Sequence, residues 1–463
     1  MTLPAGAAAM ARAVRAGSCS AAALLAETLA RIESEAGHSN AFTRRLEARA
    51  RARAAAIDRR LRRGGDPGPL AGVPFAVKDL FDVAGEITTA GSRINREHPP
   101  AKTDAVLVRR LEDAGAVLVG TLHMGEYAYD FTGENAHEGT CRNPRDRSRM
   151  SGGSSSGAGA AVAAGLVPVA LGSDTNGSLR VPASLCGVFG LKATYGRLPR
   201  SGTFAFVDSL DHVGPLAASV EDLALAYDAL QGWDPGDHVC ADRPPEPVSG
   251  TLDGAAAPLR TARAGGFFAA EDHPQARAAV DRVCTALGAV REEPLPGAAA
   301  GRAAAYLITQ AEGAALHRHR LAARAGDFDP DTRDRFLAGA LLPADWYLRA
   351  QSVRRAWRVE MAAVFARTDL LVAPCTPCTA PALGTRFLEV AGRQELLRPN
   401  LGLYTQPFSC IGLPALSVPV WLDGDALPLG VQLIAAPWRE DRCLRAARAL
   451  ERAGIAEARI GVV

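Results

Sequence analysis

A lysine at the end of an apolar segment is the first residue whose position suggests chemistry. Lys78 follows directly on Gly72-Val73-Pro74-Phe75-Ala76-Val77, a run with the composition of a buried strand. Burial disfavours the charged form of a lysine, so a buried Lys78 would be a neutral amine able to act as a general base near pH 7. Taken alone, the pattern also fits a strand-end lysine whose ammonium reaches solvent.

A serine stands at a tight turn further along the chain. Residues 167–171 are apolar, the turn after them is built from small and polar residues, and Ser178 opens a short predicted helix. Backbone N–H groups converge at such a turn and stabilise an oxyanion when no bulky side chain blocks the approach. Ser178 is therefore a candidate nucleophile. The alternative is that Ser178 only caps the helix.

Between these two positions lies a run of hydroxyls and glycines, Ser151-Gly152-Gly153-Ser154-Ser155-Ser156-Gly157, which leads into an alanine-rich helix pattern at 158–165. By composition alone this run could be a flexible linker. It also contains Gly153-x-Ser155-x-Gly157, the pattern of a nucleophile elbow. An elbow needs an apolar strand directly before it, whereas residues 143–149 are polar. The elbow interpretation is therefore weak.

The elements that would position these residues alternate between strand and helix patterns. Short apolar, β-branched runs at 73–77, 116–120, 167–171 and 188–191 are separated by helical segments such as 104–114. This alternation predicts an α/β fold with a mixed central sheet covered on both faces by helices. Residues 20–57 have helical spacing, with Ser18 or Ser20 placed as the cap of the first helix. Residues 1–60 thus read as an N-terminal helical layer.

The second half of the chain continues the pattern after one interruption. Ser219 and Asp222 resemble a capping box, and residues 232–262 are rich in Pro, Asp and Gly, which favours a surface excursion or linker. Residues 301–367 read as a helical insertion. The chain closes on predicted strands at 370–373, 415–420 and 430–433 and a helix at 441–453. We expect residues 1–463 to form one domain.

Composition limits the function classes. Lys plus Arg number 52 against 50 acidic residues, spread along the chain, so neither nucleic acid nor an anionic membrane is expected as a partner. No run is long and apolar enough to span a bilayer. Nine scattered cysteines and the absence of a signal-peptide pattern favour the cytoplasm. The single pair Cys375-x-x-Cys378 lacks a second pair, so we expect no metal and no cofactor.

Taken together, the three segments resemble the amidase signature family, whose hallmark is a Ser-Ser-Lys triad. The resemblance covers nearly the whole chain. It extends to further motifs: Gly190-Leu191-Lys192, Tyr195-Gly196-Arg197, Asp211-His212-Val213-Gly214-Pro215, Gly412-Leu413-Pro414 and Gly430-Val431-Gln432-Leu433-Ile434.

The resemblance implies a role for each matching residue. Ser178 is the nucleophile, Ser154 the bridging serine and Lys78 the base, and the peptide bond before Ser154 is cis. The oxyanion hole is formed by backbone N–H groups of Thr175, Asn176, Gly177 and Ser178, with Ser155, Asp174 and Arg180 in support. Three residues depart from the family pattern: Asn176 and Ser156 each replace a glycine, and Ala193 replaces a proline. These departures bear on positioning rather than on the reaction class.

Within the family, segments 173–178, 182–190 and 209–215 are most similar to the carboxybiuret and biuret amidohydrolases of s-triazine breakdown. This similarity implies cleavage of a C–N amide bond in a small urea-like substrate, with release of ammonia through a serine acyl-enzyme. An arginine should bind the substrate carboxylate, and Arg349, Arg354 and Arg355 are candidates. The resemblance also implies a possible small helical partner subunit, and we expect a homo-oligomer.

Three alternatives remain at this point. The chain could be the glutamine-hydrolysing subunit of an amidotransferase, a general aliphatic or aryl amidase, or a catalytically silent scaffold subunit. The scaffold is disfavoured by the intact Lys78, Ser154 and Ser178. We expect no direct catalytic role for His137 or His212, because the family relay uses no histidine. Tyr127 and Gln406 are candidates for lining the pocket.

Overall fold

The computed structural model describes residues 4–254, 258–390 and 392–461. At its centre lies an 11-stranded sheet, in which β2 is parallel to both neighbours while β10 and β16 are antiparallel to theirs. The predicted mixed α/β fold is thus confirmed. In spatial order the strands are β1 (Phe42–Arg45), β3 (Val117–Leu122), β2 (Pro74–Lys78), β8 (Val169–Asp174), β10 (His212–Ala217), β9 (Phe189–Lys192), β16 (Ala415–Val420), β17 (Leu429–Ile434), β13 (Leu370–Pro374), β11 (Thr261–Ala264) and β12 (Arg291–Glu293).

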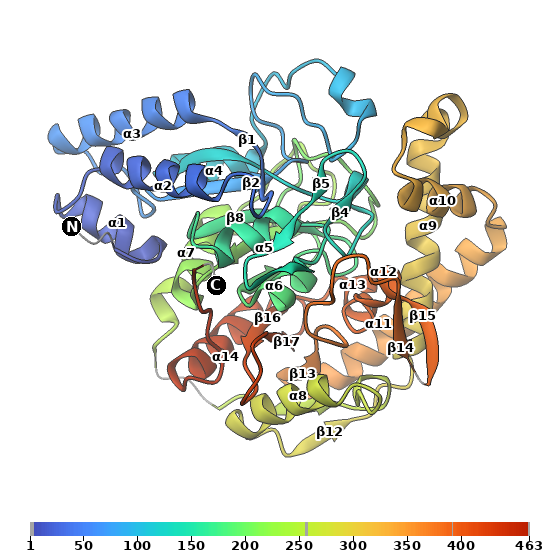
Figure 1. Cartoon of the computed structure of the whole chain (residues 1–463). Helices are drawn as coiled ribbons and strands as arrows, with labels where there is room; N and C mark the ends of the chain where they lie inside the picture. Colours follow the sequence, from blue (N-terminus) through green and yellow to red (C-terminus); the bar gives the residue numbers. More distant parts are fainter. Residues whose placement is uncertain (1–3, 255–257, 391, 462–463) are drawn as a thin grey trace.

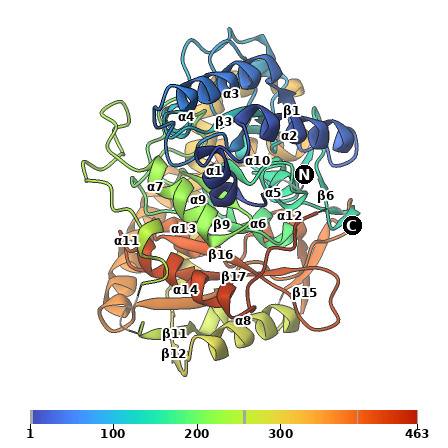
Figure 2. The same cartoon turned by 90° about the vertical axis from the view of Figure 1, so that its left-hand side faces the viewer.

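Helices cover both faces of this sheet. Helices α4 (Val106–Asp113), α7 (Val220–Leu230) and α14 (Glu440–Arg452) pack on one face, and Figure 2 shows α7 and α14 in front of the strands. Helices α5 (Ser156–Ala163), α6 (Arg180–Cys186) and α8 (Pro274–Ala286) pack on the other. The central strands are therefore buried along their whole length, which explains their continuous apolar sequences.

The N-terminal layer consists of α1 (Ala7–Arg15), α2 (Ala21–Glu35) and α3 (Glu47–Arg62). Ser20 caps α2, because its hydroxyl accepts the N–H of Ala23 at 3.1 Å. Strand β1 interrupts the layer and pairs antiparallel with β3 at the sheet edge. The helical periodicity on either side did not mark this strand, since Phe42-Thr43-Arg44-Arg45 carries no apolar alternation.

The predicted helical insertion contains α9 (Ala298–Arg324), α10 (Pro330–Ala340) and α11 (Ala344–Arg367), which pack against one another along the right-hand side of Figure 1. Beside them lie the hairpin of β14 (Phe387–Val390) and β15 (Arg393–Leu396) and two short helices, α12 (Leu397–Asn400) and α13 (Gln406–Cys410). Residues 232–254 and 258–260 form no helix or strand apart from the 3-10 turn η3 (Ser249–Thr251).

Short elements complete the described chain. The polar segment before the hydroxyl-rich run forms two small hairpins, β4 (Glu134–Asn135) with β5 (Gly139–Thr140), and β6 (Arg142–Asn143) with β7 (Asp146–Met150). Further 3-10 turns are η1 (Ile94–Glu97), η2 (Glu126–Ala128), η4 (Gly266–Phe268) and η5 (Ala325–Asp327). Over the described ranges, no helix is long and apolar enough to cross a membrane.

Candidate active site

Lys78 is fully buried at the end of β2 and faces the hydroxyl-rich segment. Its Nζ lies 2.7 Å from Oγ of Ser154 and 2.9 Å from Oγ of Ser173. Burial lowers the pKa of Lys78 to about 7, although the nearby carboxylates of Asp211, Asp174 and Asp130 act in the opposite direction. A neutral amine that donates to Ser173 directs its lone pair to Ser154, so this arrangement can take a proton from that serine.

The segment around Ser154 is held against the end of β8. The Gly153–Ser154 peptide bond is cis, as the resemblance implied. Ser155 donates its hydroxyl to the carbonyl of Ser173 at 3.1 Å, and its own N–H donates to the carbonyl of Ser178 at 3.3 Å. Ser155 thus links the segment that contains Ser154 to the turn that contains Ser178.

The turn after β8 presents unpaired donors. The N–H groups of Thr175, Asn176, Gly177 and Ser178 donate no hydrogen bond to any residue that the structure describes. The Ser178 hydroxyl likewise has no partner there, although the side chain is buried. Buried N–H groups are almost always paired in proteins, so a cluster of free donors beside a buried serine fits an oxyanion hole.

Gly177 is required at this turn for two reasons. Its φ of 141° lies in the region that favours glycine, and a Cβ there would lie 2.2 Å from Oγ1 of Thr405. Thr405 in turn donates its hydroxyl to the carbonyl of Asn176 at 2.6 Å. Asn176, which departs from the family pattern, extends its side-chain amide to Thr309 of α9 at 2.7 Å. The turn is thus tied to both the C-terminal segment and the helical insertion.

A buried ion pair between Arg180 and Asp174 flanks the turn at residues 175–178. Arg180 Nε lies 2.9 Å from Oδ2 of Asp174, and its other donors reach the Gln432 side chain at 2.8 Å, the Thr405 carbonyl and the Ser409 hydroxyl. Burial raises the pKa of Asp174, but the positive charge of Arg180 outweighs it and holds the pKa at about 2. Because every donor and acceptor is used, this pair has a structural role that fits the predicted support of the turn.

Neither His212 nor His137 contacts Ser178 in the part of the chain that the structure describes. His212 has Nδ1 against the carbonyls of Leu210 at 2.6 Å and Asp174 at 3.1 Å, and Nε2 is 3.3 Å from Lys192 Nζ. His137 lies 3.3 Å from Glu126. Among the other residues singled out in the sequence, Tyr127 is buried against His317, and Gln406 accepts a hydrogen bond from Arg302 at 2.8 Å.

A cavity of about 350 Å³ adjoins the segment before Ser154. It is lined by Thr132, Tyr306, Arg335 and Arg398 among others. The carbonyl of Thr132 accepts the N–H of Gly152 at 3.1 Å, so one lining residue of the cavity contacts the Ser154 segment. Its volume suits a small ligand.

The arginines singled out from the sequence do not face this cavity. Arg354 donates to the backbone carbonyls of Cys410 at 2.6 Å and Ser209 at 2.7 Å, and Arg349 and Arg355 lie on the exposed side of α11. Sequence reasoning missed Ser173, which contacts Lys78, Thr405 and Thr309, which contact the turn at Asn176, and Arg335, which lines the cavity. Only Ser173 and Thr405 had any local signal, as hydroxyl residues near family-like motifs.

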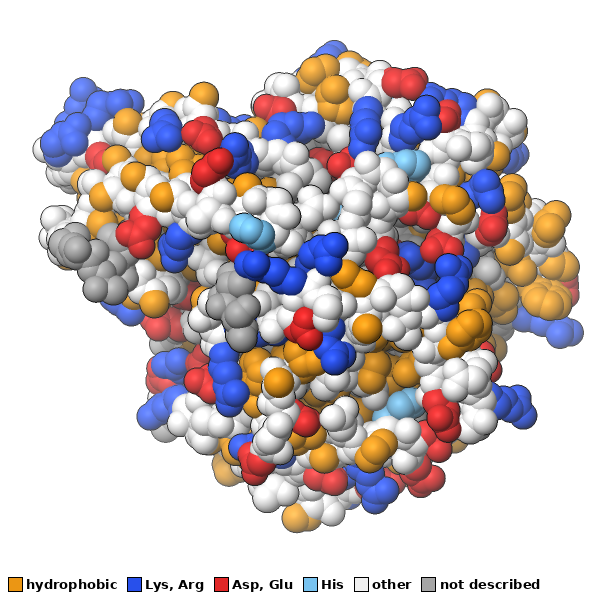
Figure 3. Space-filling view, viewed as in Figure 1, with side chains coloured by type: hydrophobic (Ala, Val, Ile, Leu, Met, Phe, Trp, Pro, Cys, Tyr) orange, Lys and Arg blue, Asp and Glu red, His pale blue; other side chains and the backbone are white. Residues whose placement is uncertain are grey.

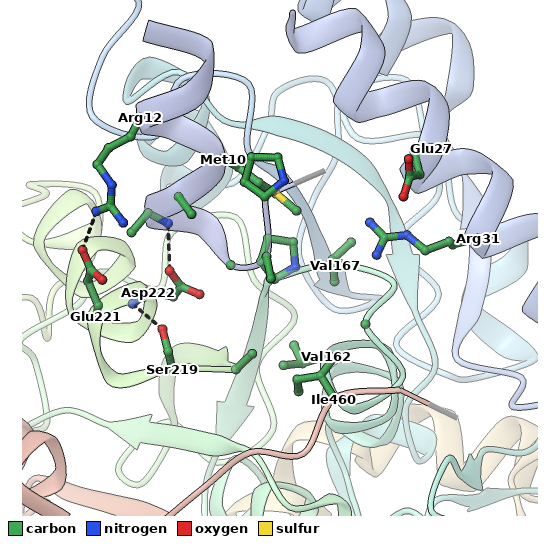
Figure 4. A pocket seen from close by; sticks show the side chains of 18 residues that line it. Met10, Arg12, Glu27, Arg31, Val162, Val167, Ser219, Glu221, Asp222 and Ile460 are labelled. Carbon is green, nitrogen blue, oxygen red and sulfur yellow. Dashed lines mark hydrogen bonds and ion pairs between the residues drawn. The ribbon is translucent and has the colours of Figure 1, made fainter. Parts of the chain in front are cut away.

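A hollow of about 520 Å³ at the opposite end of β8 is not part of this site. It lies between α1, α7 and the start of β8 (Figure 4). Asp222 accepts the N–H of Ala8 at 2.8 Å, and the Ser219 hydroxyl accepts the N–H of Asp222 at 3.1 Å. The second contact is one half of the predicted capping box, because the Asp222 carboxylate binds the N–H of Ala8 in α1. These contacts hold α1 on the sheet layer. No described cluster of His, Cys, Asp or Glu could hold a metal ion.

The fold and the site define an amidase: residues 23–444 match the amidase family model, and the chain belongs to this family, whose members hydrolyse carbon–nitrogen amide bonds. The chain is 54% identical over 444 residues to AtzE, a component of the 1-carboxybiuret hydrolase of Pseudomonas sp. (strain ADP), covering 96% of this chain and 97% of that protein. It is 39% identical to a glutamyl-tRNA(Gln) amidotransferase subunit of Anaeromyxobacter dehalogenans, covering 95% and 94%.

A solved structure agrees with this assignment. It is described as an unexpected vestigial protein complex that reveals the evolutionary origins of an s-triazine catabolic enzyme. It superposes with a TM-score of 0.96 and 52% sequence identity, and the match covers 98% of this chain and 100% of that one.

Proposed function

We propose that this amidase hydrolyses the terminal amide of a small carboxylated urea such as carboxybiuret, with release of ammonia through an acyl-enzyme on Ser178. The observation that carries the reaction is the contact of buried Lys78 with Ser154 beside the Ser178 turn. The substrate class rests on the 54% identity to a carboxybiuret hydrolase over nearly the full length of both chains.

In the acylation step, neutral Lys78 accepts the proton of Ser154, which accepts the proton of Ser178, while Oγ of Ser178 attacks the amide carbonyl carbon. The resulting oxyanion is held by the free N–H groups of residues 175–178. The proton then returns through Ser154 to the amide nitrogen, the carbon–nitrogen bond breaks and ammonia leaves. Water repeats the relay on the ester, which releases the carboxylic acid and restores Ser178.

The pH dependence of kcat/KM follows from the protonation state of Lys78. Only the neutral amine accepts a proton, and burial places its pKa at about 7. We expect kcat/KM to fall about tenfold per pH unit below this value and to reach a plateau above it. Initial rates of ammonia release between pH 5 and 9 measure the profile. A flat profile across neutral pH would contradict the assignment of Lys78 as the base.

Arg335 is the candidate for binding the substrate carboxylate. Its guanidinium lies 3.4 Å from the Tyr129 ring centroid and donates to the Tyr129 carbonyl at 2.7 Å. No described Asp or Glu oxygen lies within ion-pair distance of it, whereas Arg398 in the same cavity pairs with Asp331 at 3.0 Å and with Asp130. An arginine without an acidic partner in a cavity can bind an anionic ligand. The helical insertion would shape this pocket through Tyr306 and Arg335.

We therefore expect Arg335→Gln to raise KM for carboxybiuret about 10- to 100-fold, the cost of losing a charge-assisted hydrogen bond. The rate with uncharged biuret should change little. Arg386→Gln is the matched control, because Arg386 lines the same cavity with its side chain mostly exposed. An equal loss of activity toward carboxybiuret and toward uncharged biuret would show that Arg335 does not bind the carboxylate.

The glutamine-hydrolysing alternative is kept because of the 39% identity to an amidotransferase component. Ammonia release from carboxybiuret, biuret, allophanate, glutamine and simple aliphatic amides separates the candidates. The proposal expects carboxybiuret to have the highest kcat/KM of the panel. A preference for glutamine, or for aliphatic amides, would overturn the substrate assignment and leave the triad to be tested by its own variants.

A further inference from the structure

Asp130 is a buried carboxylate between the 3-10 turn η2 and strand β4, and no step of the relay uses it. Its Oδ1 accepts the N–H of Thr132 at 2.9 Å and the Thr132 hydroxyl at 2.8 Å. Its Oδ2 accepts the N–H of Gly133 at 2.7 Å. A buried carboxylate with donors on both oxygens has a well-defined position.

Arg398 of α12 supplies the positive charge that a buried carboxylate needs. Its guanidinium pairs with Asp130, and it also lies 3.0 Å from Asp331 of α10 and 3.4 Å from Glu134. Asp331 is in turn 3.8 Å from Arg386. Figure 3 shows basic and acidic side chains next to one another to the right of its centre, where α12 approaches α10. Because an unpaired buried charge is costly, Arg398 holds the Asp130 carboxylate in place.

Two glycines that hold Ser154 lie directly against the Asp130 side chain. Gly153 precedes Ser154, and a Cβ at Gly153 would lie 2.5 Å from Oδ2 of Asp130. Gly125 donates its N–H to the Ser154 carbonyl at 3.3 Å, and a Cβ at Gly125 would lie 2.3 Å from Cβ of Asp130. Neither glycine has a positive φ, so close packing on Asp130 is what requires them. A shift of Asp130 therefore moves the backbone on both sides of Ser154.

Asp130 also acts on the base through its charge. Burial lowers the pKa of Lys78 to about 7, and the negative charges of Asp211, Asp174 and Asp130 oppose this effect. Asp174 is paired with Arg180, and Asp211 accepts backbone N–H groups at 2.8 and 2.9 Å. Asp130 thus touches the segment of the bridging serine and also faces the base.

We propose that Asp130, held in place by Arg398, is a positioning residue that keeps Ser154 in contact with the base. This role depends on the Lys78–Ser154–Ser178 relay proposed above. Because Arg398 also lines the cavity beside Arg335, the ion pair connects the wall of that cavity to the relay.

The test uses Asp130→Asn and Arg398→Gln, singly and together, in the full chain. The substrate is the amide of the panel given above that wild type cleaves fastest. Each single variant is expected to lower kcat about 10- to 100-fold, since displacement of a catalytic group by about 1 Å has an effect of this size. Arg398→Lys keeps the positive charge and should recover part of the loss.

The pH profile of kcat/KM distinguishes an effect on the relay from a general loss of structure. Asp130→Asn removes an anion that faces Lys78, which lowers the pKa of Lys78 and moves the fall in rate to lower pH. Arg398→Gln leaves the Asp130 charge without its partner, which raises the pKa of Lys78 and moves the fall to higher pH. The double variant removes both charges and should return the profile toward its wild-type position.

Asp369→Asn is the matched control. Asp369 is also buried, pairs with Arg260 at 2.9 Å and accepts a backbone N–H at 3.0 Å, but it is not among the charges that act on Lys78. This variant should lose stability in denaturant unfolding while its kcat and its pH profile stay at the wild-type values.

The proposal would be overturned if kcat stayed at the wild-type value in both Asp130→Asn and Arg398→Gln. It would equally be overturned if kcat fell in both variants while the pH profile stayed in place, because the pair would then only stabilise the fold. A wild-type profile without a fall in rate below pH 7 would refute the relay itself, and this role of Asp130 with it.

Discussion

Replacement of Ser178 by alanine is expected to lower kcat by roughly 10⁴- to 10⁶-fold, because it removes the atom that forms the acyl-enzyme. The loss should be confined to catalysis. The Ser178 hydroxyl forms no hydrogen bond with any described residue, so its removal breaks no internal contact. We expect the free energy of unfolding to change by less than about 0.5 kcal/mol. Ammonia release and denaturant unfolding of the same preparation measure both.

Ser155→Ala serves as the comparison within the same site. Its hydroxyl bridges the backbone N–H and carbonyl of Ser173 and has no direct place in the relay. This variant should lose stability together with a smaller part of its activity. If Ser178→Ala kept activity near the wild-type level while Ser155→Ala lost it, the nucleophile would have been assigned to the wrong serine.

The second large effect is expected for Lys78→Met, with kcat reduced about 10³- to 10⁵-fold through loss of the general base. Methionine is a suitable replacement because it has similar length and carries no charge into a fully buried position. The variant should also lose the decline of kcat/KM below pH 7 that the pKa of Lys78 causes. Residual rates across pH are the measurement.

Lys192 provides a matched control for this experiment. It is also fully buried, and burial lowers its pKa to about 7 as well. Its Nζ, however, contacts the carbonyls of Leu413 and Ala193 and the His212 ring rather than a catalytic serine. Lys192→Met should keep the acidic limb of the pH profile. If that limb disappeared in Lys192→Met and persisted in Lys78→Met, the group that titrates would be Lys192, and the assignment of Lys78 as the base would be wrong.

Most residues of the candidate site could be predicted from the sequence, because they lie in short, local patterns. Lys78 ends an apolar strand and Ser178 follows another, and the two strands β2 and β8 are neighbours in the sheet. Residues 415–420 were predicted with their observed bounds, since a buried strand needs only a local apolar run. The N-cap of α7 was likewise readable from Ser219 and Asp222.

The sequence could not predict contacts that join distant parts of the chain. Thr309 reaches the turn only through the packing of α9 against it, where its hydroxyl accepts the side-chain amide of Asn176, and no local pattern marks it. For the same reason, the three arginines named from the sequence as candidates for binding the substrate carboxylate all lie on α11, whereas Arg335 of α10 lines the cavity. Strand β1 was missed because it is a short polar strand at the sheet edge, where alternation of apolar residues is not required.

The central claim is that the substrate becomes covalently attached to Ser178. The most direct test is to quench the enzyme with acid during turnover of carboxybiuret and to map the modified peptide by mass spectrometry. The account predicts an added mass equal to the acyl group on the peptide that contains Ser178, placed on Ser178 rather than Ser154 by fragmentation because no Lys or Arg separates the two serines, and absent in Ser178→Ala. An acyl group on Ser154 or on a cysteine, with Ser178 unmodified, would contradict it.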